Sequence, residues 1–225
     1  MSVKQHYLWV ITTPRSGSEM LCRSLREAGM TNLREELKEL DTTVENFIFP
    51  PRIKFFPYHI KEDKKRWENP SLFIDEILTT YPEMKFIYLL REDKIAQLTS
   101  EYIAIQHNVW GIYEEHRFSR VLRSQVDKLP GHKKVIHWLS QYRYYNQIFI
   151  KIAKQKGVPC LDVTYEELSK NRDDEWLKVF DFCGLDRKNI RKTDKYRDKK
   201  WIIRNYRKEY YEKVYNRFKQ LFSPM

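Results

Sequence analysis

The chain has 225 residues and a formal net charge of +11, with 41% hydrophobic, 15% aromatic and 32% charged residues. This composition excludes a disordered chain, and without a long apolar run it also excludes a membrane-spanning helix. The cysteines Cys22, Cys160 and Cys183 are widely spaced and odd in number, which encodes neither a disulfide framework nor a zinc site. We therefore expect one soluble, cytoplasmic domain that spans residues 1–225.

The first predicted element is a buried strand at Tyr7–Thr13, a short apolar run with β-branched residues. The next five residues, Pro14–Ser18, form a predicted turn. A helix is expected from Glu19 up to a capping glycine, Gly29. Its apolar face would consist of Met20, Leu21, Leu25 and Ala28.

Further strands and helices alternate along the rest of the chain. Short apolar runs predict strands at Arg52–Phe56, Lys85–Leu90 and Val158–Val163. Helical spacing predicts one helix from about Asp93 to Gln106 and a long one from about Lys133 to Lys156, capped by Gly157. This alternation predicts an α/β fold with a central, mostly parallel sheet flanked by helices.

Sheets of this kind bind ligands beyond the carboxyl ends of their strands. We therefore expect Pro14–Ser18, Phe56–His59 and Arg91 to lie along one edge of the sheet. The polar segment Gly111–Gly131 lacks a clear period and is expected to be a mobile or substrate-facing insertion.

The C-terminal part of the chain is strongly basic. From Asp186 to Lys219 there are 14 Lys and Arg against 5 Asp and Glu, a net charge of 14 − 5 = +9. Such a balance predicts an anionic partner, namely a nucleic acid, an acidic membrane or a small polyphosphate-like ligand, although a solvated basic helix surface explains it equally well. A core-packing helix is expected here from the stripe Ile203, Tyr206, Tyr210, Val214, Phe218 and Leu221.

The strand–turn–helix unit around Gly17 is typical of an anion site. The first N–H groups of a helix lack intrahelical acceptors and carry partial positive charge. Gly17 permits a close approach of the backbone, Ser16 and Ser18 add hydroxyls, and the guanidinium of Arg15 matches a phosphate or sulfonate. An ordinary turn with Ser18 as N-cap is the other interpretation. A nucleoside-triphosphate loop is excluded, because that motif needs Gly-Lys-Ser/Thr and here Ser18 and then Glu19 follow Gly17.

The segment Thr12–Ser18, together with Met20–Cys22 (MLC) one residue later, resembles the 5′-phosphosulfate loop of sulfotransferases, and in particular that of the trehalose sulfotransferase family. Further blocks match in the family's order: Phe86–Ser100, Gln106–Trp110, Val163–Leu168 and Thr193–Tyr206. The resemblance implies a P-loop-like sulfotransferase fold. It also implies 3′-phosphoadenosine 5′-phosphosulfate (PAPS) as donor and transfer of its sulfuryl group to a hydroxyl of a carbohydrate or other small molecule.

The resemblance assigns roles to individual residues. It places the 5′-phosphosulfate on Arg15, Ser16, Gly17 and Ser18, and the 3′-phosphate on Arg91 and Ser100. Family members often carry a second arginine where this chain has Glu92, and Thr99 offers a hydroxyl beside that of Ser100.

Sulfuryl transfer is an in-line displacement in which the enzyme positions the reactants and neutralises charge on the leaving oxygen. Arg15 is the candidate for stabilising that oxygen, because it lies in the loop itself. The resemblance places Glu36 at the general-base position, although its segment also has the pattern of a surface amphipathic helix. His59 is the rival base and Lys54 a candidate contact of the sulfonate. This chemistry requires no metal.

Two other function classes compete with this interpretation. A nucleic-acid-binding module would explain the basic C-terminal segment with its interleaved tyrosines, but not the strand–turn–helix unit. A phosphate-loop kinase is disfavoured, because this chain lacks the Gly-Lys pair of that loop. We therefore expect the partner to be a small molecule with an acceptor hydroxyl, which the sequence does not identify. We expect no nucleic-acid partner and no membrane span. A homodimer is one allowed assembly.

Overall fold

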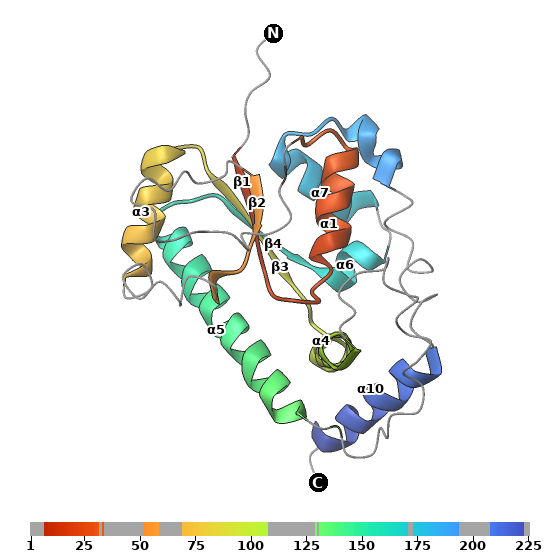
Figure 1. Ribbon diagram of the computed structural model, residues 1–225. Helices are drawn as coiled ribbons and strands as arrows, with labels where there is room; N and C mark the ends of the chain where they lie inside the picture. Colours follow the sequence, from red (N-terminus) through yellow and green to blue (C-terminus); the bar gives the residue numbers. More distant parts are fainter. Residues whose placement is uncertain are drawn as a thin grey trace.

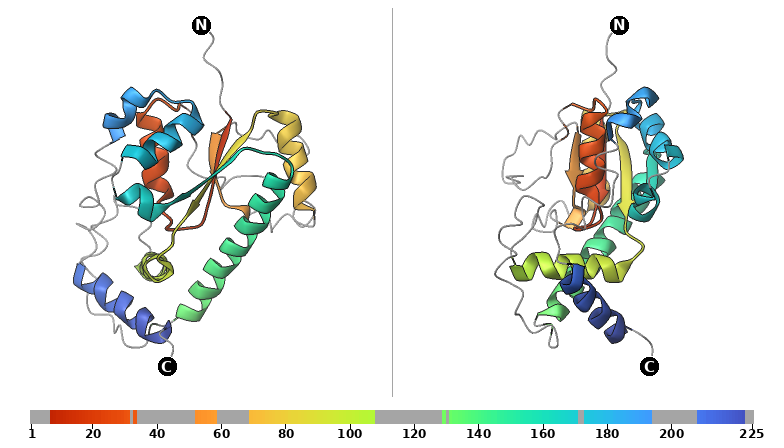
Figure 2. Two further views of the ribbon diagram at one scale, coloured as in Figure 1. Left: turned by 180° about the vertical axis from the view of Figure 1, so that it is seen from behind. Right: turned by 90° about the vertical axis from the view of Figure 1, so that its right-hand side faces the viewer.

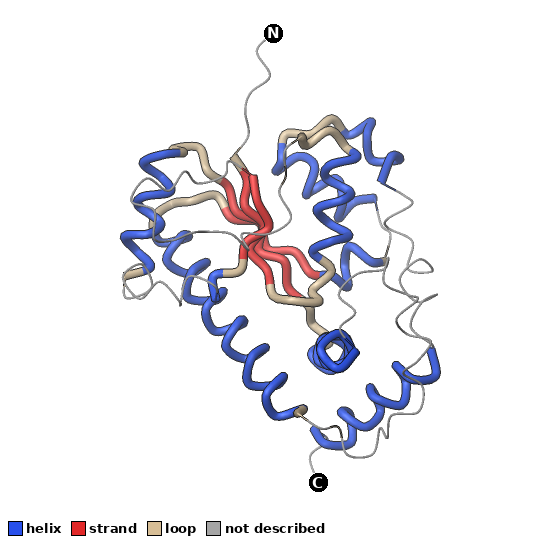
Figure 3. Tube along the Cα trace, in the orientation of Figure 1, coloured by secondary structure: helices blue, strands red, loops and turns tan. Residues whose placement is uncertain are grey.

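The computed structural model describes residues 7–31, 33, 52–58, 69–107, 129, 131–170, 173–193 and 208–222. Its centre is a sheet of the strands β1 (Leu8–Thr12), β2 (Arg52–Phe55), β3 (Lys85–Leu90) and β4 (Cys160–Thr164). The strand order is β2-β1-β3-β4, and every neighbouring pair is parallel (Figures 1 and 3). The expected α/β fold with a parallel sheet flanked by helices is therefore confirmed.

Helices cover both faces of this sheet (Figure 1). One face carries α1 (Ser18–Glu27), α6 (Tyr165–Ser169), α7 (Asp173–Cys183) and the 3₁₀ helix η4 (Arg187–Thr193). The other face carries α3 (Pro70–Thr80) and α5 (His132–Gln155). Side and rear views show α4 (Lys94–His107) lying across the carboxyl end of the sheet, next to α10 (Lys208–Phe222) (Figure 2).

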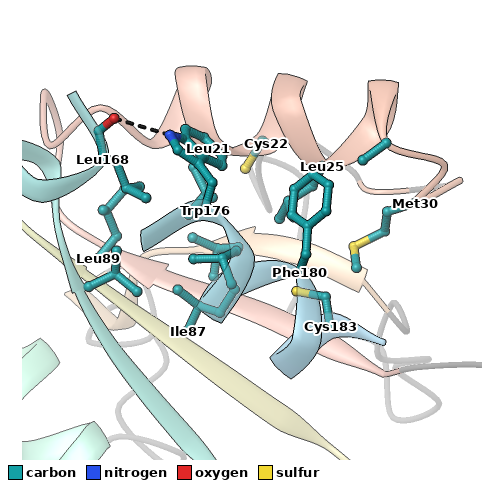
Figure 4. Close-up of a cluster of buried hydrophobic side chains, with 14 of the residues drawn as sticks. Leu21, Cys22, Leu25, Met30, Ile87, Leu89, Leu168, Trp176, Phe180 and Cys183 are labelled. Carbon is teal, nitrogen blue, oxygen red and sulfur yellow. Dashed lines mark hydrogen bonds between the residues drawn. The ribbon is translucent and has the colours of Figure 1, made fainter. Parts of the chain in front are cut away.

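Alternation along β1 divides the core into two layers, because successive side chains of a strand point to opposite faces. Leu8 and Val10 pack with α1 and α7, where the Trp176 indole donates a hydrogen bond to the Leu168 carbonyl at 3.1 Å (Figure 4). Trp9 and Ile11 face α3 and α5. The buried aromatic side chains of that second layer are Trp9, Phe55, Phe73, Phe86, Tyr88 and Phe149.

A third apolar cluster attaches α4 to α5 and α10. Tyr102 of α4 packs edge-on against Phe218, with ring centroids 5.5 Å apart. The predicted C-terminal stripe is correct for Tyr210, Val214 and Phe218, which are buried, but wrong for Leu221, which is 48% exposed. Leu221 lies in the last turn, beyond the part of α10 that reaches α4. The stripe's first two residues, Ile203 and Tyr206, lie outside the described residues.

Most predicted elements occur close to their expected bounds. The strand Lys85–Leu90 is confirmed at both ends, whereas β4 begins at Cys160, two residues later than expected. The cause is the end of α5, where the Val158 N–H donates to the Ala153 carbonyl after Gly157 turns the chain at φ 77°. Val158 therefore belongs to the helix cap rather than the strand.

Two parts of the sequence interpretation had a different outcome. The helices α3 and α7 were not predicted, although both are amphipathic and have buried apolar side chains. The proposed insertion Gly111–Gly131 lies outside the described residues except for Leu129 and Gly131. Within the described ranges, none of the helices is long and apolar enough to span a membrane.

Candidate functional site

The carboxyl ends of the strands bring the predicted loops to one edge of the sheet. In register, Ile11 of β1 lies beside Phe55 of β2, and Thr12 lies beside Leu89 of β3. The chain therefore leaves β1 into Pro14–Ser18 at the same edge at which it leaves β3 at Arg91 (Figure 1). The expected edge is confirmed for these two segments and for Phe56; His59 lies outside the described residues.

The loop after β1 has two residues in the left-handed backbone region. Arg15 has φ 57° and Gly17 has φ 88°. Gly17 is the N-cap of α1, which begins at Ser18, so the alternative with Ser18 as N-cap is wrong. Among the described residues, no side chain caps this helix start by a hydrogen bond. The first turn of α1 therefore directs its N–H groups toward the edge of the sheet without a side-chain cap.

Close packing explains why residue 17 is a glycine. A Cβ at Gly17 would overlap the ring of Tyr165, the first residue of α6. The ring thus lies directly against the loop backbone. Ser16 is fully buried, and its hydroxyl is hydrogen-bonded to that of Thr12. The Ser16 hydroxyl therefore faces β1, while Ser18 starts the helix.

The predicted residues Arg91 and Ser100 both contact the loop through Arg15. The Arg15 Nε donates to the Ser100 hydroxyl at 2.9 Å, and the Arg91 guanidinium donates to the Arg15 carbonyl at 2.9 Å. The neighbouring Thr99 hydroxyl donates instead to the Ile95 carbonyl on its own helix, at 2.8 Å. The two sites expected from the sequence thus join at Arg15, and the hydroxyl at this junction is that of Ser100.

Arg91 is held between two residues of α6. Its guanidinium carbon lies 4.7 Å from the centroid of the Tyr165 ring, and its Nε lies 3.9 Å from the Glu166 carboxylate. That ion-pair distance is too long for a hydrogen bond, and the buried Nε has no hydrogen-bond partner among the described residues. Glu166 also accepts hydrogen bonds from the backbone N–H groups of Glu92 and Asp93, which fixes the chain before α4.

Two residues that the sequence analysis did not single out also contact the loop. The amide of Gln97, on α4, donates to the Pro14 carbonyl and the Thr13 hydroxyl, both at 2.6 Å. Its oxygen accepts a hydrogen bond of 2.6 Å from Arg143, on α5. Gln97 falls within a block that matches the family, and this was the only signal for it; Arg143 carried no signal.

Glu101, which follows Ser100 on α4, has a buried carboxyl group near the loop. It is only 4% exposed, and its Oε2 has no hydrogen-bond partner among the described residues. Burial raises the pKa of Glu101 to about 7, against the opposing effect of the Arg15 charge. A carboxyl group that titrates near neutrality therefore lies within the field of Arg15.

The candidate residues for proton transfer are not placed by this structure. Glu36 and His59 both lie outside the described residues. Lys54 is described: it is buried at the end of β2, with its ammonium 5.6 Å from the centroid of the Phe56 ring. Among the described residues, His, Cys, Asp and Glu side chains nowhere gather in groups of three that could hold a metal ion.

Comparison with known proteins identifies the family. Residues 43–189, more than half of the chain, match a family model described as the sulfotransferase family. This span contains Arg91, Gln97, Ser100 and Arg143, whereas the loop Pro14–Ser18 precedes it. No curated protein and no solved structure matches the chain. With its parallel sheet and the P-loop-like fold of that family, the chain belongs to the sulfotransferases and is a transferase that moves sulfuryl groups.

Proposed function

We propose that this sulfotransferase uses PAPS as donor and transfers its sulfuryl group to a hydroxyl of a carbohydrate or another small molecule. The loop residues Arg15–Ser18 bind the 5′-phosphosulfate. Arg91 and Ser100 bind the 3′-phosphate. The resemblance of the loop to that of the trehalose sulfotransferase family makes a sugar the first acceptor class to examine.

One observation carries this proposal: Arg15, Arg91 and Ser100 meet at an uncapped helix start beyond the sheet. Two permanent cations and a set of N–H groups suit a ligand with two anionic groups. The buried Arg91 Nε, which lacks a hydrogen-bond partner among the described residues, has a donor to offer such a ligand. The residues present therefore fit a nucleotide that carries anionic groups at the 3′ and 5′ positions of its ribose.

The chain's residues would act on the reaction as follows. The acceptor oxygen forms a bond to sulfur while the bond from sulfur to the bridging oxygen breaks, and that oxygen keeps the electron pair on the adenosine bisphosphate product. Arg15 stabilises the negative charge that develops there. Glu36 takes the proton of the acceptor hydroxyl, with His59 as the alternative base. Lys54 is proposed to contact the transferred sulfonate.

Three further features belong to the same proposal. Residues 1–225 form one domain, the protein is cytoplasmic, and its subunits pair as a homodimer. The cytoplasmic location is supported by the three cysteines, all of which are thiols rather than disulfides. Light scattering of the purified protein would give the subunit number, and a monomer at micromolar concentration would rule out the dimer.

The donor is tested by binding of the product, adenosine 3′,5′-bisphosphate. At about 100 times its dissociation constant this ligand should stabilise the fold by about 2.7 kcal/mol, which a thermal melt detects. No shift and no calorimetric heat at millimolar ligand would overturn the proposal. Salt-dependent binding of an oligonucleotide in the same preparation would then favour the nucleic-acid module.

The acceptor requires a separate experiment. Small-molecule extracts are incubated with the enzyme and PAPS carrying an isotopic label in its sulfuryl group. Mass spectrometry then identifies compounds that gain one labelled sulfate. Trehalose and other free sugars serve as the first defined acceptors, and a labelled lipid or protein in place of a sugar would overturn the proposed acceptor class.

A further inference from the structure

The backbone of Arg15 adopts a conformation that a non-glycine residue rarely adopts. Its φ of 57° lies in the left-handed region, where the Cβ crowds the backbone, and Leu129 is the other non-glycine residue with positive φ among those described. Such a conformation persists only where the surrounding structure holds it. The structure should therefore contain contacts that hold the peptide groups on either side of Arg15.

Two side chains hold these two peptide groups. The Gln97 amide donates to the Pro14 carbonyl at 2.6 Å, and Arg91 donates to the Arg15 carbonyl at 2.9 Å. The first peptide plane turns with the φ of Arg15 and the second with its ψ. Holding both carbonyls therefore fixes the backbone at Arg15, and with it the direction in which its side chain leaves the loop.

The side-chain amide of Gln97 is hydrogen-bonded through both its nitrogen and its oxygen. It is fully buried, and its second amide hydrogen donates to the Thr13 hydroxyl at 2.6 Å. Its oxygen accepts from the Arg143 guanidinium, also at 2.6 Å. The amide cannot rotate without losing three hydrogen bonds. It thus ties the loop after β1 to α4 and, through Arg143, to α5.

Arg143 is an unexpected residue for a purely structural contact. Burial lowers its pKa, and among the described residues no carboxylate forms an ion pair with it, Gln97 being its hydrogen-bond partner there. A charged donor makes a stronger hydrogen bond than a neutral one and polarises the amide toward the Pro14 carbonyl. Its charge also adds to the positive field behind the loop, which a neutral side chain could not supply.

We propose that Gln97 and Arg143 are positioning residues, which preform the loop after β1 for the 5′-phosphosulfate without touching the donor. The proposal rests on the function proposed above, because it needs the 5′ group of the donor to lie on this loop. Removing either residue should release the left-handed conformation of Arg15. Affinity for the 5′ group should then fall, while affinity for the 3′-phosphate should stay.

The experiment compares two ligands by isothermal titration calorimetry. Adenosine 3′,5′-bisphosphate uses both ends of the site, and adenosine 3′-monophosphate lacks the 5′ group. For Gln97→Met and Arg143→Met we expect about tenfold weaker binding of the bisphosphate and a change below about twofold for the monophosphate. Arg143→Lys, which keeps the charge, should recover part of the loss. Arg187→Met is the matched control: it removes an arginine of η4 that pairs with Asp181 of α7, and it should bind both ligands like the wild type.

Gln97→Glu separates positioning from stability. Its carboxylate can pair with Arg143 and so preserve the link to α5, but it cannot donate to the Pro14 carbonyl. We expect a melting temperature near that of the wild type together with weak bisphosphate binding. If Gln97→Glu weakens binding and the uncharged Gln97→Met does not, the added charge is the cause and the proposal is wrong.

The outcomes also distinguish this inference from the function on which it rests. A wild-type protein that fails to bind the bisphosphate overturns the proposed donor. If the wild type binds the bisphosphate and the variants show the same ratio of bisphosphate to monophosphate affinity as the wild type, only the positioning role is overturned. Equal weakening of both ligands with a lower melting temperature would show that Gln97 and Arg143 merely stabilise the fold.

Discussion

The guanidinium Nε of Arg15 lies 2.9 Å from the hydroxyl of Ser100 and donates a hydrogen bond to it. This contact joins the loop after β1 to α4 across 85 positions of the sequence. We expect Ser100→Ala to raise the dissociation constant of adenosine 3′,5′-bisphosphate by about five- to tenfold, because it removes one hydroxyl from the site. Thr99→Val is the matched control, since the Thr99 hydroxyl bonds within its own helix. Equal effects of the two variants would contradict this assignment.

Arg91 should matter for both ends of the donor. Its side chain holds the Arg15 carbonyl and is also the proposed contact of the 3′-phosphate. Arg91→Ala should therefore weaken the bisphosphate by about 10- to 100-fold and also weaken adenosine 5′-monophosphate, although less. Calorimetry with both nucleotides measures the difference. Unchanged binding of the 5′-monophosphate would show that Arg91 does not support the loop.

Gly17→Ala should be far more damaging than other glycine substitutions. The added Cβ meets the Tyr165 ring and the φ of 88° disfavours any side chain, so we expect a loss of stability above about 1 kcal/mol and no bisphosphate binding. Gly157→Ala is the control: its φ of 77° is similar, but no atom of the described residues outside its chain neighbours lies within 4 Å of the added Cβ. Thermal melts of the two variants isolate the contact with Tyr165, and equal melting temperatures would refute it.

Glu101 should make the stability of the ligand-free protein depend on pH. The folded protein holds a proton on this carboxyl up to its pKa of about 7, whereas an unfolded chain releases it near the ordinary glutamate pKa of 4.5. The contribution of Glu101 is therefore fully present below pH 4.5 and declines as the pH rises through 7. We expect Glu101→Gln to flatten this decline, so that the variant gains on the wild type toward pH 8. Urea denaturation at several pH values measures this, and parallel curves would show that Glu101 is already ionised.

The general base is tested by a pair of isosteric variants once an acceptor is known. Glu36→Gln should leave bisphosphate binding nearly intact but lower turnover by about two to four orders of magnitude, because an amide cannot take the proton. His59→Asn should retain most of the activity. The opposite result, with a normal rate for Glu36→Gln and none for His59→Asn, would transfer the role to the histidine.

Local patterns in the sequence determined the elements that form the sheet edge. The apolar run Lys85–Leu90 predicts a strand with the bounds observed, and Pro14 with Gly17 predicts the turn after β1. These features are readable because strand and helix periods depend on neighbouring residues alone. The loop motif indicated Arg15, the resemblance to the sulfotransferases added Arg91 and Ser100, and these three residues do come together.

Only the tertiary structure decided which side chains support that motif. Thr99 and Ser100 are adjacent in sequence, but about 100° of helix rotation separates them, so the docking of α4 determined that Ser100 faces Arg15. Gln97 and Arg143 lie 46 positions apart, on helices whose own patterns concern their apolar faces. A polar contact between two helices leaves no period in either sequence, because it depends on where α4 and α5 meet in the folded chain.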